Sequence, residues 1–246
     1  MQDSNDDLCL SPVLSVEQAE ELVEWYSKWY SNGPIWLYNL CELSPEVAEV
    51  LAKHKGDIYF QRLTELTPEV AEAIARHQGD HLLFNEISTL SDSTIAALAR
   101  HEGALLSLDA LTELTDNAAE SLATYSGGLE LDGLTSLTVK AATALAKHRN
   151  FLSLYGLVTA DDEVIEALVN HEGPLYLHGL YTISDEGARL LASSRCKLSL
   201  SGLTEISEKA IETLARRKWK LSGDRPECPP EIVQQHSDFT VDDTSV

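Results

Sequence analysis

The sequence predicts an α/β solenoid, with short parallel strands on the concave face and α-helices on the convex face. A segment that alternates apolar and variable residues recurs eight times, at intervals of 23 or 24 residues, and a helix-capping residue follows each copy. One strand and one helix cannot bury their own apolar faces, whereas stacked copies can. Because strands stack about 4.8 Å apart and helices about 8–10 Å apart, the helical side must splay and the stack must curve. The copies are IWLYNLCEL (35–43), IYFQRLTEL (58–66), LLFNEISTL (82–90), LSLDALTEL (106–114), LELDGLTSL (129–137), LSLYGLVTA (152–160), LYLHGLYTI (175–183) and LSLSGLTEI (198–206).

The first element of each copy is a short, half-buried strand. In Leu129–Glu130–Leu131–Asp132, for example, apolar and polar residues alternate with a period of two, which is typical of a strand with one buried face.

The second element is a one-sided helix of about three turns. Apolar residues follow the capping residue at the fourth and seventh positions, as in Ala48 and Leu51, and Pro45 and Pro68 stand at the first helical position of two copies. We expect glycines to end the helices. The caps are Ser44, Thr67, Ser91, Thr115, Thr138, Asp161, Ser184 and Ser207, and the glycines are Gly56, Gly79, Gly103, Gly127 and Gly173.

Both ends of the array need caps. We expect residues 1–14 to be disordered and residues 15–32 to form a capping helix, in which Tyr26, Trp29 or Tyr30 covers the end of the stack. Residues 33–223 then form eight repeats and a truncated ninth, and residues 224–246 form a C-terminal cap or a flexible tail.

The pattern LxLxGLTxL followed by a capped helix, as in SDEGARLLA, resembles bacterial leucine-rich-repeat proteins of a variant type over residues 15–223. The resemblance implies a right-handed solenoid and a protein-binding scaffold whose concave strands carry the contacts. One position departs from the family's pattern, because an apolar residue replaces the usual Asn or Cys, and we expect a tighter turn there. These residues are Leu40, Leu63, Ile87, Leu111, Leu134, Leu157, Leu180 and Leu203.

The composition constrains the partner. The chain has 18 basic and 40 acidic side chains, a formal charge of −22, which disfavours nucleic acid and anionic membranes and favours a basic partner. No apolar run of roughly 18 residues and no signal peptide is present, so we expect a cytoplasmic monomer without a cofactor. Reduced thiols are then expected, although pairs Cys9/Cys41 and Cys196/Cys228, which have equal separations, remain an alternative.

Side chains between and just after the inward leucines point outward on the strand face. Aromatic residues occupy five of these 16 positions, whereas the chain average predicts about one, and no position is Lys or Arg. Exposed aromatic residues with a polar rim are typical of interface hot spots. We therefore expect this face to bind a protein or peptide. The expected contact residues are Trp36, Tyr38, Tyr59, Asp109, Glu130, Asp132, Tyr155, Tyr176 and His178.

Asp109, Glu130 and Asp132 leave alternatives open, because they stand on adjoining coils. They form a solvated acidic patch that attracts a basic partner, a Ca²⁺ site, or an acid/base pair of the glycosidase kind. The rival functions are thus a carbohydrate- or cation-binding module and, less favoured, a hydrolase that uses Asp109 and Asp132. No P-loop, G-x-S-x-G or H-E-x-x-H motif supports an enzyme.

A histidine recurs just before the glycines. We interpret these residues as structural groups at the helix C-termini, where an imidazole bonds the last carbonyls and suits the helix dipole when it is protonated. They are His54, His77, His101, His148 and His171.

Overall fold

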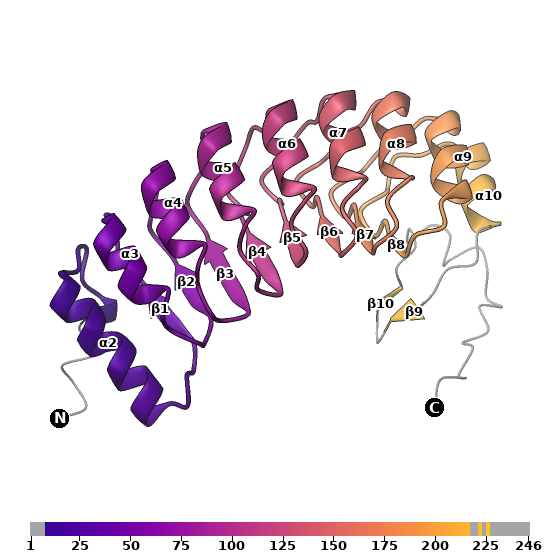
Figure 1. Cartoon of the computed structure of the whole chain (residues 1–246). Coiled ribbons are helices and arrows are strands. Elements are labelled where there is room, and N and C mark those ends of the chain that lie inside the picture. The colour runs from indigo at the N-terminus through magenta and orange to yellow at the C-terminus, as the bar shows by residue number, and fades with distance from the viewer. Residues whose placement is uncertain (1–7, 217–220, 223–224, 227–246) are drawn as a thin grey trace.

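The computed structural model describes residues 8–216, 221–222 and 225–226. Within this part, an eight-stranded parallel sheet follows chain order, and each strand is followed by a helix. Figure 1 shows an arch with the strands along its inner, concave side and the helices along its outer side. The predicted α/β repeat solenoid is confirmed. The strands are β1 (Ile35–Leu37), β2 (Ile58–Phe60), β3 (His81–Phe84), β4 (Leu105–Ser107), β5 (Gly128–Glu130), β6 (Leu152–Ser153), β7 (Leu175–Tyr176) and β8 (Leu198–Ser199).

The helices of the repeats are shorter than the three turns expected. In α3–α8 the regular helix has seven residues, about two turns. Each of these helices ends in a turn with hydrogen bonds between residues three apart. In the first repeat, for example, the His54 N–H donates to the Leu51 carbonyl at 2.9 Å. The helices are α3 (Pro45–Leu51), α4 (Pro68–Ile74), α5 (Asp92–Leu98), α6 (Asp116–Leu122), α7 (Val139–Leu145), α8 (Asp162–Leu168), α9 (Asp185–Ser193) and α10 (Glu208–Ala215).

One core runs between the strands and the helices. The inward leucines of the strands are fully buried, as are Leu129 and Leu131. Leu134, at the position of the missing asparagine, is also fully buried, and its N–H donates to the Leu131 carbonyl at 3.2 Å. This bond closes the tight turn that the sequence indicates. Burying each such leucine stabilises the fold by about 1.5–3 kcal/mol.

All eight predicted capping residues start a helix, and seven of their side chains accept a hydrogen bond from the third helical N–H. Asp161 occupies the cap position but makes no such bond. In four coils the cap hydroxyl also donates to the aspartate that begins the preceding helix, and we call this arrangement the cap ladder. Its pairs are Thr115 to Asp92, Thr138 to Asp116, Ser184 to Asp162 and Ser207 to Asp185.

The cap ladder is interrupted between α7 and α8. Val139 stands where α5, α6, α8 and α9 begin with aspartate, and Asp161 has no hydroxyl to donate. A carboxylate at both positions would place two negative charges side by side. The apolar Val139 avoids this repulsion with Asp161.

The glycines after the helices have a different role from the one expected. Gly79 does not adopt a positive φ, so it is not a left-handed helix stop. A Cβ on Gly79 would instead lie 2.2 Å from the Gly56 carbonyl oxygen of the preceding coil. Glycine is needed here because the backbones of neighbouring coils approach too closely for any side chain.

The N-terminal end is more ordered than expected. Ser15 and Gln18 form a capping box at the start of α2 (Val16–Trp29), which buries Leu22. Residues 8–14, expected to be disordered, pack on the first coil: Cys9 is buried and its carbonyl accepts the Tyr38 N–H at 2.9 Å. These residues cover the open edge of the stack, which explains their order. Residues 1–7 lie outside the described part.

The aromatic residues of α2 behave differently from one another. Tyr26 packs against the core, as expected of the lid. Trp29 is 66% exposed and Tyr30 is 48% exposed, so neither covers the end of the stack.

The truncated ninth repeat does not extend the sheet. β9 (Leu221–Ser222) pairs antiparallel with β10 (Arg225–Pro226), which supplies its backbone partners in place of β8. The expected cap or tail at residues 224–246 lies outside the described residues, apart from residues 225–226. Cys41 is a free thiol, so the alternative Cys9/Cys41 pair does not form. Cys228 lies outside the described part, and the Cys196/Cys228 pair stays untested.

Candidate functional site on the concave strand face

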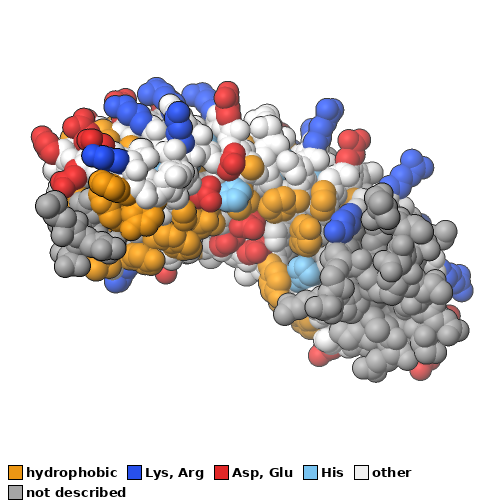
Figure 2. All heavy atoms as spheres, turned by 90° about the horizontal axis from the view of Figure 1, so that it is seen from below, with side chains coloured by type: hydrophobic (Ala, Val, Ile, Leu, Met, Phe, Trp, Pro, Cys, Tyr) orange, Lys and Arg blue, Asp and Glu red, His pale blue; other side chains and the backbone are white. Residues whose placement is uncertain are grey.

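The strand register places the first outward column as predicted. Trp36 lies opposite Tyr59, and Ser107 lies opposite Glu130. Tyr176 continues this column on β7. Figure 2 shows acidic side chains in the middle of this face, between two groups of hydrophobic side chains.

The N-terminal group of the face is aromatic. The rings of Trp36 and Tyr59 stack at 3.8 Å with an angle of 7°, and Tyr38 lies 6.2 Å from Trp36. Tyr38 is 48% exposed. Because Trp36 and Tyr59 brace each other, they form a rigid platform whose ordering costs little entropy on binding. We call Trp36, Tyr38 and Tyr59 the N-terminal platform.

Asp57 and His81 also belong to this face, and the sequence analysis missed them. The Asp57 carboxylate accepts hydrogen bonds from the His81 backbone N–H and from His81 Nδ1, both at 3.1 Å, and from the Tyr59 hydroxyl at 3.5 Å. Each stands one residue before the first inward leucine or isoleucine, so the alternation of the strand already assigned it outward. The outward face therefore begins one step earlier along the strand than the two predicted columns.

The centre of the face is an acidic cluster of Asp109, Glu130 and Asp132. Burial, followed by the charge of Asp132, raises the pKa of Asp109. Burial, followed by the charges of Asp109 and Asp132, raises the pKa of Glu130. Among the described residues, none of the ion pairs involves these three carboxylates. The cluster therefore holds crowded negative charge without an internal counter-ion.

Asp132 differs from its two neighbours because it is anchored. Its Oδ1 accepts hydrogen bonds from the Ser153 hydroxyl at 2.5 Å and from the Tyr155 N–H at 2.9 Å. These bonds hold the carboxylate in one place. The cluster thus offers an anchored carboxylate beside two carboxyl groups whose pKa burial raises.

The C-terminal group of the face is again aromatic. His178 lies 5.3 Å from the Tyr155 ring and 5.8 Å from the Tyr176 ring. Its Nδ1 contacts the Ser201 hydroxyl. Phe151, which the sequence analysis also missed, packs edge-on against Tyr176. We call Phe151, Tyr155, Tyr176 and His178 the C-terminal platform.

The recurring histidines form a structural stack in the segments that lead from the helices to the strands. All five are buried. The His77 and His101 rings stack at 5.5 Å, and Tyr125 continues the row at 6.2 Å. His77 Nε2–H donates to the Gly56 carbonyl at 2.8 Å, and the Tyr125 hydroxyl donates to the Gly103 carbonyl at the same distance. We call this row the histidine ladder; His54, His77 and Tyr125 each bond a backbone carbonyl of the preceding coil.

Burial lowers the pKa of every histidine in the ladder, and it lowers the pKa of His77 to about 4. These imidazoles are therefore neutral at pH 7. The expectation that they bond the last carbonyls of their helices is wrong for His54 and His77, because each bonds a glycine carbonyl of the preceding coil instead. A protonated imidazole that complements the helix dipole is excluded by this burial.

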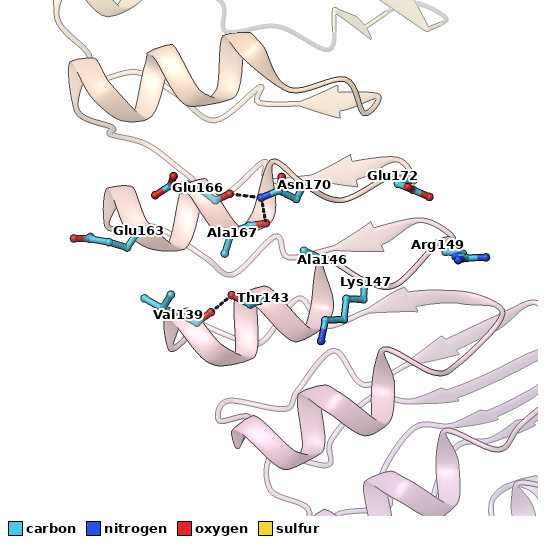
Figure 3. Close-up of a pocket in the computed structure, with 10 residues that line it drawn as sticks. All are labelled: Val139, Thr143, Ala146, Lys147, Arg149, Glu163, Glu166, Ala167, Asn170 and Glu172. Carbon is cyan, nitrogen blue, oxygen red and sulfur yellow. Dashed lines mark hydrogen bonds between the residues drawn. The ribbon is translucent and has the colours of Figure 1, made fainter.

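A hollow of about 720 Å³ lies on the helical side, between α7 and α8 (Figure 3). Small side chains, such as Ala146 and Ala167, leave this space, and it coincides with the interruption of the cap ladder. Thr143 and Asn170 hydrogen-bond to carbonyls of their own helices. Both basic and acidic residues line the hollow, so it has no charge preference.

No protein-family model matches the chain, and no curated protein is similar to it. Within the described residues, no three His, Cys, Asp or Glu side chains are grouped so that they could hold a metal ion. None of the described helices combines the length and the apolar character needed to cross a bilayer.

Proposed function

We propose that this protein is a non-enzymatic scaffold that binds a protein or peptide on its concave strand face. The observation that carries the proposal is the arrangement of outward side chains on the strand face, where two aromatic groups flank an acidic centre. Aromatic anchors with a polar surround supply most of the binding energy in protein interfaces. The likeness of the repeats to bacterial leucine-rich repeats supports the same function by analogy of fold.

The face also has the rigidity that a binding surface needs. Its side chains project from hydrogen-bonded parallel strands, and ring stacking fixes Trp36 against Tyr59. A surface that is already ordered loses less conformational entropy on binding. The overall charge of −22 would favour association with a basic partner and protect the free protein from self-association.

The test is capture of a partner from a lysate of the native cells on immobilised protein. The triple variant Trp36→Ala, Tyr59→Ala and Tyr155→Ala should lose capture because it removes an anchor from each platform. Val139→Ala on α7 is the control, since Val139 is an exposed apolar side chain on the helical side. Equal capture by the triple variant and the wild type, with circular dichroism showing both folded, would overturn the proposal.

A further inference from the structure

The acidic cluster on the concave face lacks a positive partner within the described part of the chain. Its three carboxylates lie in the middle of the sheet, and both outward columns that contain them lack Lys and Arg. Like charges so close destabilise the free protein. An external cation would remove this repulsion, so the arrangement suits a cationic ligand.

A second observation points to a ligand at the same place. Ser107 is completely buried at the floor of the cluster, opposite Glu130 on the neighbouring strand. Its hydroxyl lies close enough to Asp109 and Glu130 to lower the pKa of both against the effect of burial, whereas Asp109 Oδ1 is buried without a hydrogen-bond partner. An unsatisfied buried polar group costs about 1–3 kcal/mol. A ligand donor between these carboxylates would satisfy Asp109 Oδ1 once the carboxyl group turns to expose that oxygen.

The two platforms limit the length of the ligand. Tyr59 on β2 and Tyr176 on β7 are five strand steps apart, which corresponds to roughly 24 Å at about 4.8 Å per step. An extended chain covers this distance with about seven residues. Glu130 on β5 lies three steps from Tyr59 and two from Tyr176, or roughly 14 Å and 10 Å. A residue on the cluster is therefore about three or four positions from residues on either platform.

We infer that the concave face binds an extended peptide segment that crosses the strands and places an Arg or Lys side chain on Asp109 and Glu130. Apolar residues three or four positions before and after this basic residue lie on the N-terminal and C-terminal platforms. The inference rests on the proposed function and adds the chemistry of the partner. A guanidinium group fits best, because its fork of N–H donors can satisfy both carboxylates at once.

The experiment uses a phage-displayed library of random 12-residue peptides, selected on the immobilised full-length protein. The selected peptides should share one Arg or Lys with apolar residues three or four positions away on both sides. The tightest peptide is then synthesised with a fluorescent label, and its Kd is measured by anisotropy. Citrulline in place of Arg, or norleucine in place of Lys, should weaken binding at least tenfold, which is about 1.4 kcal/mol.

Variants of the protein test the position of the cation. Asp109→Asn with Glu130→Gln should weaken the tightest peptide at least tenfold, without loss of folding, because the change removes repelling charges. Glu163→Gln with Glu166→Gln is the matched control: it removes the same charge from exposed positions on the helical side and should leave Kd within about twofold.

The outcomes separate the two proposals. Selected peptides without a basic residue, or equal Kd values for the wild type and the Asp109/Glu130 variant, overturn the basic-segment inference alone. Peptides that bind the Trp36/Tyr59/Tyr155 triple alanine variant as tightly as the wild type overturn the proposed binding face as well. Recovery of no binding peptide overturns both.

Discussion

The histidine ladder makes the stability of this fold depend strongly on pH. Each imidazole is buried and neutral, and burial lowers its pKa below the value of the unfolded chain. As the pH falls below about 6.5, these imidazoles become protonated in the unfolded chain but stay neutral in the folded protein. The free energy of unfolding must therefore decrease as the pH falls through this window.

The magnitude follows from His77. Its pKa is lowered from 6.5 to about 4, and each pKa unit corresponds to about 1.36 kcal/mol, so His77 alone removes about 3 kcal/mol between pH 6.5 and pH 4. Because His77 is only 4% exposed, little solvent screening reduces this value. His54 and His101, on the adjoining coils, shift in the same direction, so their losses add.

The assay is urea unfolding followed by circular dichroism at a series of pH values from 7.5 to 4. The variant is His77→Tyr, chosen because Tyr125 fills the equivalent position and donates the equivalent hydrogen bond without titrating near neutral pH. The difference in unfolding free energy between wild type and variant should change by about 1.4 kcal/mol per pH unit below pH 6. Other titrating groups cancel in this difference, and so does any constant cost of the larger ring.

If the unfolding free energies of the wild type and the variant changed in parallel with pH across this range, the reasoning would be refuted. If the larger ring prevents folding, His77→Gln gives the same comparison with a smaller side chain. NMR offers an independent check, because the His77 ring signals of the folded protein should not titrate above about pH 5. A His77 titration near pH 6.5 would equally contradict a buried, neutral imidazole.

Two further predictions concern packing and capping. Phe60→Ala should destabilise the fold by about 3–5 kcal/mol in urea unfolding, because Phe60 is fully buried and stacks on Phe84; a loss below about 1 kcal/mol would contradict the packing described. Asp161→Ser should stabilise the protein by about 0.5–1 kcal/mol, because serine can accept the bond that Asp161 leaves unmade. Combined with Val139→Asp, it should stabilise by more than the sum of the single changes, since the pair completes the cap ladder. Additive melting shifts would argue against that coupling.

The periodicity of the sequence predicted the architecture because each coil obeys the same local rules. Alternation in segments such as Leu129–Asp132 assigned the strands and the outward column, and the hydroxyl of residues such as Thr67 marked a helix start. These properties depend on a few neighbouring residues. They can therefore be recognised in the sequence without knowledge of how the coils stack.

Features that depend on contacts between coils could not be predicted in the same way. The neutral state of His77 follows from how deeply the stack buries it, and the anchoring of Asp132 follows from Ser153 on the next strand. Gly79 has the residue type expected of a helix stop, yet its reason lies in the backbone of the preceding coil. Asp57 and His81 are a different case, because the apolar/polar alternation of their strands already assigns them to the outward face.

The cap ladder also determines which coils can be exchanged, duplicated or deleted. Each link joins an aspartate at the start of one helix to a hydroxyl at the start of the next, so a coil has an input side and an output side. A coil that begins with Thr115 and Asp116 matches itself and can be repeated, whereas the coil that begins with Asp161 accepts only a predecessor without an acidic first residue, as Val139 provides. Recombination of coils in this array should therefore follow a matching rule between the first residues of neighbouring helices, on the opposite side of the sheet from the concave strand face.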